Sequence, residues 1–163
     1  MKTTDRRLAD LEQIVRGSYK VRPTNPIACR VYSGSVQALT SSGTAYALSF
    51  ENERWDEHGM HGTALTKITA PVSGWYSIWG GVEYASNGTG VRDLMIRMDG
   101  SVYLAFVRQQ APTADAAELV VSTLYYLTAG QYVELVARQY STGALNVGVA
   151  ANRSPEFAVT MIK

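Results

Sequence analysis

The fold is decided by the stretch Ile68-Thr-Ala-Pro-Val-Ser-Gly-Trp-Tyr-Ser-Ile-Trp-Gly-Gly-Val-Glu-Tyr84. After a turn at Gly74, its composition favours a β-strand. Because side chains alternate between the two faces of a strand, Trp75 and Trp79 point to one side. The opposite side receives a second apolar set, namely Tyr76, Ile78, Val82 and Tyr84. An antiparallel strand with one wet face would alternate apolar with polar residues, so we expect both faces to be covered.

A second stretch, Leu119-Val-Val-Ser-Thr-Leu-Tyr-Tyr-Leu127, repeats this pattern. In a chain of 163 residues, another copy of the same chain is the simplest cover for the second face. The expected interface consists of aromatic side chains: Trp75, Trp79, Tyr76, Tyr84, Tyr125, Tyr126 and Phe157. Alternation leaves open which face of each strand is core and which is interface.

Size and charge limit the class of protein. A chain of this length suits one domain that buries roughly 70 % of its unfolded surface without disulfides or metal. The single Cys29 is read as a small buried apolar residue. Residues 1–22 hold six basic and three acidic side chains, whereas the whole chain carries a net charge of +1. This mildly basic segment suits an acidic protein surface and is too weak to indicate nucleic acid. No apolar run is long enough for membrane insertion, and no signal peptide is expected.

Residues 1–17 are predicted to form an N-terminal arm with a short helix over 4–16. Its apolar positions are Leu8, Leu11, Ile14 and Val15, and Gly17 ends it. Isolated helices of about 12–15 residues or fewer are marginal in water, so this one must pack against something. It could form a brief coiled coil with symmetry mates, dock on a larger assembly, or fold back on its own body. Residues 18–27, with two prolines and no periodicity, are predicted to be a linker.

Residues 28–163 are predicted to form an all-β head, because short strand-like runs alternate with turns and no helical pattern follows residue 17. The expected strands are 29–33, 36–39, 44–50, 64–69, 74–84, 91–98, 102–109, 118–127, 131–139, 145–150 and 156–162. Asp99-Gly100 marks a hairpin, and Ala129-Gly130 marks a second break. About ten short strands with this spacing indicate a sandwich or jelly roll.

Residues 28–162 resemble the C1q/TNF-like jelly roll, in particular the C1q-like modules of bacteriophage virion proteins. Four segments carry this resemblance: 50–61, 68–78, 124–135 and 154–162. The most specific parts are Gly74-Trp-Tyr76 together with the Leu-x-x-Gly-x-x-Val-x-Leu run at 127–135. The resemblance implies a homotrimer whose subunits meet along a threefold axis. Gln131 stands where the family often has Asp, and no collagen-like stem precedes the head.

Candidate catalytic and metal sites have weaker support than structural interpretations. His58 and His61 flank Gly59-Met60, but two histidines on a turn do not supply the three or four ligands that zinc needs, so a structural turn is favoured. Glu51, Glu53, Asp56 and Glu57 are read as solvated charges of one loop. No nucleophile motif surrounds a serine, and Cys29 has no histidine near it in sequence. We expect no enzyme, no cofactor and no metal.

The expected function is that of a non-enzymatic, trimeric structural protein on the surface of a phage virion, made in the host cytoplasm. It would serve as a capsid decoration, head fibre or small tail appendage, and residues 1–22 would bind other virion proteins. The alternative is an adhesin that binds a host surface or polysaccharide. Its ligand, which could be a host-surface glycan, would contact the loops 86–90, 110–117 and 141–144, which are rich in Gly, Ser, Thr, Ala and Asn.

Overall fold

The computed structural model describes residues 26–40, 42–113 and 115–163, and within them it contains strands and turns but no helix. The strands are β1 (Ala28–Tyr32), β2 (Gln37–Leu39), β3 (Ala45–Ala47), β4 (Asn52–Asp56), β5 (Ile68–Thr69), β6 (Gly74–Tyr84), β7 (Val91–Met98), β8 (Val102–Gln110), β9 (Ala117–Leu127), β10 (Tyr132–Gln139), β11 (Leu145–Gly148) and β12 (Glu156–Met161). The predicted helix over 4–16, with Leu8, Leu11, Ile14 and Val15, lies outside the described residues. So does the linker up to residue 25. None of the described residues belongs to a helix that could span a membrane.

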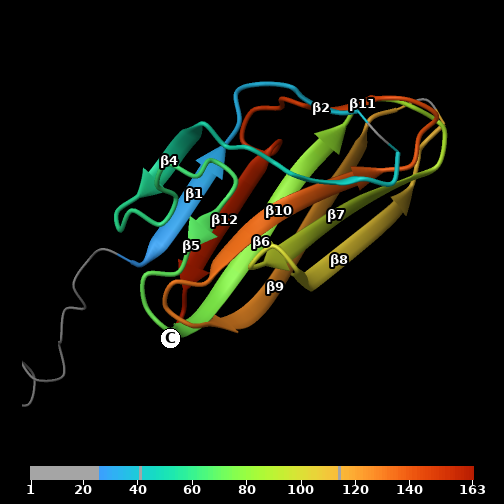
Figure 1. Ribbon diagram of the computed structural model, residues 1–163. Coiled ribbons are helices and arrows are strands. Elements are labelled where there is room, and N and C mark those ends of the chain that lie inside the picture. The colour runs from blue at the N-terminus through green and yellow to red at the C-terminus, as the bar shows by residue number, and fades with distance from the viewer. Residues whose placement is uncertain (1–25, 41, 114) are drawn as a thin grey trace, which may run out of the picture.

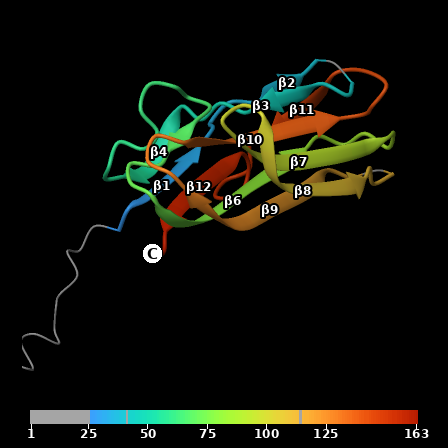
Figure 2. The ribbon, with the colours of Figure 1, turned by 60° about the horizontal axis from the view of Figure 1, so that its bottom comes forward.

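The strands form two antiparallel sheets that pack face to face (Figure 1, Figure 2). Sheet A has seven strands in the order β2-β11-β6-β12-β1-β4, and β9 pairs with the opposite side of β6. Sheet B has five strands in the order β3-β10-β7-β8, and β5 also pairs with β10. Strands β8 and β9 are edge strands that lie side by side. The predicted all-β jelly roll is confirmed for the described residues.

The core lies between the sheets and contains one of the two apolar faces predicted for β6. Tyr76, Ile78 and Tyr84 are fully buried and face apolar residues of β7 and β10. Gly80 occupies a position on the same face where the sheets approach closely: a Cβ atom there would lie 2.5 Å from Cδ1 of Leu135. A side chain at position 80 would therefore push the sheets apart.

Both predicted turns are present. Asp99 and Gly100 have φ values of 49° and 72°, and the N–H of Ser101 donates to the carbonyl of Met98 at 3.1 Å. Two positive φ values in a four-residue turn are the signature of a type I′ hairpin, whose twist matches the flanking strands. At the second break Gly130 has a φ of 88°, which an L-residue with a side chain rarely adopts.

The segment predicted as a charged loop contains a strand. Glu53 and Asp56 belong to β4, which pairs with β1 at the end of sheet A. A register shift between Arg30 and Val31 inserts an extra residue into β4, so its side chains do not alternate regularly. The predicted runs 44–50 and 64–69 form only the short strands β3 and β5.

The two ends of the sandwich differ in what they carry. At the proximal end the carbonyl of Ile27 accepts a hydrogen bond from the N–H of Met161, and the carbonyl of Lys163 accepts one from Trp75. Both ends of the described chain therefore lie together (Figure 1). The connections β6–β7, β8–β9 and β10–β11 lie at the opposite, distal end (Figure 1, Figure 2).

Candidate self-association surface

The outer face of sheet A carries a stripe of exposed apolar side chains. Strands β6 and β9 pair over their full lengths, with Trp75 opposite Tyr126 and Ser77 opposite Leu124. The rings of Trp75 and Tyr126 meet edge to face, with centroids 5.8 Å apart. Ile162 joins them because its N–H donates to the carbonyl of Trp75 at 2.8 Å. The four apolar residues of this stripe are each between 45 % and 54 % exposed: Trp75, Leu124, Tyr126 and Ile162.

Beside this stripe, a buried carboxylate holds two arginines across three strands. Glu156 of β12 is 1 % exposed and pairs with Arg30 of β1 and Arg54 of β4. The guanidinium of Arg30 also lies 5.1 Å from the ring of Trp79 and 5.8 Å from that of Trp55. The two guanidinium groups face a single carboxylate, so this group of residues keeps one net positive charge. This face is therefore apolar at β6 and β9 and aromatic and cationic at β12, β1 and β4.

The structure places the residues predicted for the interface in three kinds of position: on the outer face of sheet A, near its open edge, and in the core. Trp75, Trp79 and Tyr126 lie on the outer face of sheet A. Tyr125 belongs to the other face of β9, although it remains 37 % exposed near the open edge.

Tyr76, Tyr84 and Phe157 are 0 % exposed core residues, and the expectation that they contact another subunit is wrong. The physical reason is that sheet B packs against the face of sheet A from which these side chains project, so they lie in the core. The hydroxyl of Tyr76 donates to the carbonyl of Val72 at 2.7 Å, and Phe157 stacks on Phe50 with centroids 5.9 Å apart.

Sequence reasoning missed several residues of this surface: Arg30, Trp55, Glu156 and Ile162. Trp55 lies in the segment interpreted as a loop, and Arg30 and Glu156 are 126 positions apart in the chain. A charged residue at one strand position does not reveal which distant residue it faces. The one available signal was the apolar character of both faces of β9, which placed Val120 and Leu124 on one face without showing that this face is the outer one.

The described parts of the three loops considered for ligand binding gather at the distal end (Figure 1), and the loop 86–90 is held there by hydrogen bonds. Arg92, which is fully buried, donates from Nη2 to the carbonyl of Asn87 at 2.7 Å and from Nη1 to that of Thr89 at 2.9 Å. Gly90 has a φ of 75°, and a Cβ there would lie 2.0 Å from the carbonyl oxygen of Tyr140. The loop 86–90 is thus joined to its neighbours by backbone contacts.

The His58–His61 segment forms a turn organised by Asp56. The carboxylate of Asp56 accepts hydrogen bonds from the N–H groups of Met60 and His61 at 2.9 and 2.8 Å. The ring of His61 is nearly buried and lies 3.1 Å from a carboxylate oxygen of Glu53. Among the described residues no group of three or more potential ligands could hold a metal ion.

Cys29 is a buried free thiol, as predicted. Burial, reinforced by the nearby carboxylates of Asp56 and Glu53, raises the pKa of this thiol far above its ordinary value. A thiol that remains protonated is a poor nucleophile. The structural interpretation of Cys29 therefore agrees with its surroundings.

Comparison with known proteins identifies the fold. No protein-family model matches the chain, and no curated protein matches it. Among solved structures, Eiger TNF from S. frugiperda aligns with a TM-score of 0.65 at 11 % identity, covering 85 % of this chain and 94 % of that one. Murine APRIL at pH 5.0 aligns with a TM-score of 0.66 at 7 % identity, covering 85 % and 100 %. At these identities the likeness concerns the fold alone, and the described residues form a TNF-like jelly-roll domain.

Proposed function

We propose that this protein is a non-enzymatic structural head that forms a homotrimer and is displayed on a phage virion. The observation that carries the self-association is the exposed stripe of Trp75, Leu124, Tyr126 and Ile162 on the outer face of sheet A. Contiguous exposed apolar surface of this kind marks interaction sites in soluble proteins. Aromatic side chains and arginine, both present on this face, are the residue types enriched at the centres of protein interfaces.

A ring of subunits is favoured over a pair by the presence of a second, different apolar surface. Val102, Tyr103 and Tyr125 lie at the adjoining edge strands β8 and β9 and are between 37 % and 49 % exposed. A twofold contact buries the same patch on both subunits, whereas two unlike patches suit a head-to-tail contact that closes a ring. In the proposed trimer, the outer face of sheet A on one subunit is covered by the β8–β9 edge of the next.

The positions of the described ends support display from a particle. The chain enters the sandwich at the proximal end, and the loops 86–90, 110–117 and 141–144 lie at the distal end (Figure 1). A segment that precedes residue 26 is therefore connected to the end that lies opposite the loops. We propose that residues 1–17 anchor the head, so that the loops face away from the particle.

The solution mass of the full chain tests the trimer directly. Sedimentation equilibrium is expected to give three times the chain mass of 17.8 kDa. A monodisperse species of 17.8 kDa would refute the proposed assembly. Mass spectrometry of purified particles tests the virion location, since the protein must copurify with capsid or tail proteins. Its absence from particles made by cells that express it would refute that location.

The gathering of three polar loops at one end favours the adhesin as a second candidate. Loops held on a rigid scaffold commonly carry binding residues. Purified heads would then bind cell-wall glycans, and substitutions in the loops 86–90 and 141–144 would abolish that binding. If binding persisted in the loop variants, these loops would not be the ligand surface.

A further inference from the structure

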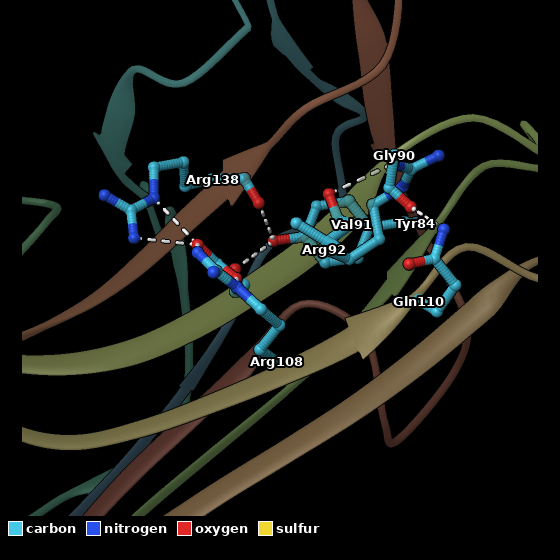
Figure 3. Close-up of polar contacts among 8 residues, drawn as sticks. Tyr84, Gly90, Val91, Arg92, Arg108, Gln110 and Arg138 are labelled. Carbon is cyan, nitrogen blue, oxygen red and sulfur yellow. Dashed lines mark hydrogen bonds and ion pairs between the residues drawn. The ribbon is translucent and has the colours of Figure 1, made fainter.

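The outer face of sheet B carries a charged cluster that differs from the apolar residues argued for the trimer. Asp93 of β7 lies between Arg108 of β8 and Arg138 of β10, which are its register partners on the two neighbouring strands. Arg108 binds the carboxylate through Nε at 2.7 Å and Nη2 at 2.9 Å. Nε and Nη2 of Arg138 both lie 2.8 Å from Oδ2 (Figure 3). We name these three residues, together with Phe106 and Tyr140, the Asp93 cluster.

Positive charge in this region exceeds what the one carboxylate neutralises. Arg92, the residue before Asp93, points to the opposite face and is fully buried. It donates to the carbonyls of Asn87, Thr89 and Val91 and to the Asn87 side chain, and no ion pair with an acid is formed among the described residues. Arg108 and Arg138 against Asp93 give the cluster a charge of +1, and the buried Arg92 adds one positive charge on the other face of β7. The cluster therefore attracts an anion.

The two outer guanidinium groups keep donors for a ligand. A guanidinium has five N–H donors, and two nitrogens of each group face Asp93, which leaves Nη1 of each directed elsewhere. The side chain of Arg108 is 46 % exposed and that of Arg138 24 %. Both side chains are therefore accessible to solvent. An oxyanion that bound these donors would form charge-assisted hydrogen bonds.

Neighbouring aromatic rings hold both arginines in place. The ring of Tyr140 lies 5.5 Å from the guanidinium carbon of Arg108 and 5.4 Å from that of Arg138. Phe106 lies 5.3 Å from Arg108 and is 50 % exposed. Because the carboxylate and the rings already fix the guanidinium planes, a ligand would not have to order them. The exposed ring surface beside these donors offers an apolar contact for the flat side of a sugar.

We infer that the Asp93 cluster binds the carboxylate groups of an acidic polysaccharide. The remaining Nη1 group of each arginine can donate to a carboxylate oxygen, and the aromatic surface next to it suits a pyranose ring. Nucleic acid is disfavoured because it requires a dense basic face, whereas the whole chain has a net charge of only +1. Arg108 and Phe106 belong to β8, whose edge the proposed trimer uses through Val102 and Tyr103. The inference itself is argued from contacts within one chain and does not require the trimer.

Titration of the full chain with hexagalacturonate, a uronic acid oligomer, tests this inference by calorimetry. Binding is expected, whereas maltohexaose, a neutral oligomer of the same length, is expected not to bind. Arg108→Gln and Arg138→Gln should each weaken binding about tenfold, the loss expected for one charge-assisted hydrogen bond.

The matched control is Arg97→Gln. Arg97 lies on the same face of β7, but Glu134 neutralises it at 2.9 Å, so this variant removes the same charge outside the cluster and should bind as the wild type does. Circular dichroism confirms that each variant is folded. Absence of binding to the wild type, or equal losses in all three arginine variants, would overturn the inference. So would maltohexaose binding as tightly as hexagalacturonate, or binding of only a single-stranded oligonucleotide.

Discussion

Replacing Tyr126 with Asp tests the proposed subunit contact at its centre. A tyrosine presents about 200 Å² of surface, and Tyr126 is 47 % exposed in the single chain. About 90 Å² is therefore available for burial in a subunit contact, which at ~25 cal/mol per Å² contributes about 2 kcal/mol. Enclosing an unpaired carboxylate adds a penalty of similar or greater size. The total of about 4 kcal/mol per contact corresponds to a roughly thousandfold weaker association.

Because the side chain is exposed, the substitution should leave the fold of the single chain intact. Sedimentation equilibrium at about 10 µM should then give a folded species of 17.8 kDa for the variant and three times that mass for the wild type. Val36→Asp is the matched control, since Val36 is 58 % exposed in the loop between β1 and β2 and should have no effect. A Tyr126→Asp variant that retained the wild-type mass would refute the assignment of this face.

Three further predictions concern the core, acid stability and the anchor. Gly80→Ala should destabilise the protein by about 1–3 kcal/mol in urea unfolding, because its Cβ would collide with the buried side chain of Leu135. Leu135→Ala in the same chain should relieve that clash. If the losses of unfolding free energy of the two single variants simply added in the double variant, the clash would not be the cause. Burial opposes ionisation of Asp93, but hydrogen bonds from Arg108 and Arg138 outweigh it and lower the pKa of this carboxyl below its ordinary value of 3.8. The stabilisation by Asp93 is therefore complete above the unfolded pKa of about 3.9 and is lost as the pH falls through the lower folded value. The difference in the free energy of unfolding between wild type and Asp93→Asn should accordingly shrink below about pH 4. A difference that stays constant down to about pH 2 would contradict this linkage. Deletion of residues 1–17 should leave a folded trimer that no longer enters particles, and normal incorporation of the truncated chain would show that the anchor lies elsewhere.

Much of the fold was predictable because it is encoded locally. The pattern in 74–84 and 118–127 identified β6 and β9 almost to the residue, and Asp99-Gly100 identified the β7–β8 turn. Strand β4 was missed because its residues are mostly charged and a register shift with β1 disrupts their alternation. Residues with no apolar period carry no signal that separates an edge strand from a loop.

The candidate surface was predictable only in part. The double apolar character of β6 and β9 indicated that two faces needed cover, and Trp75, Trp79 and Tyr126 do lie on the outer one. Tyr76 and Tyr84 were assigned to the same interface and instead belong to the core. A strand presents its two faces symmetrically in sequence, so the assignment of core and surface depends on which side the second sheet packs.

The amino-acid order alone indicates an all-β domain whose strands carry more apolar surface than a sheet with one solvated face can explain. Which half of that surface is enclosed follows from the packing of the two sheets, because it depends on contacts between residues far apart in the chain. The same reason applies to both charged clusters. Glu156 meets Arg30 across 126 positions and Asp93 meets Arg138 across 45. Pairings at such separations follow from strand order and register, which no local pattern specifies.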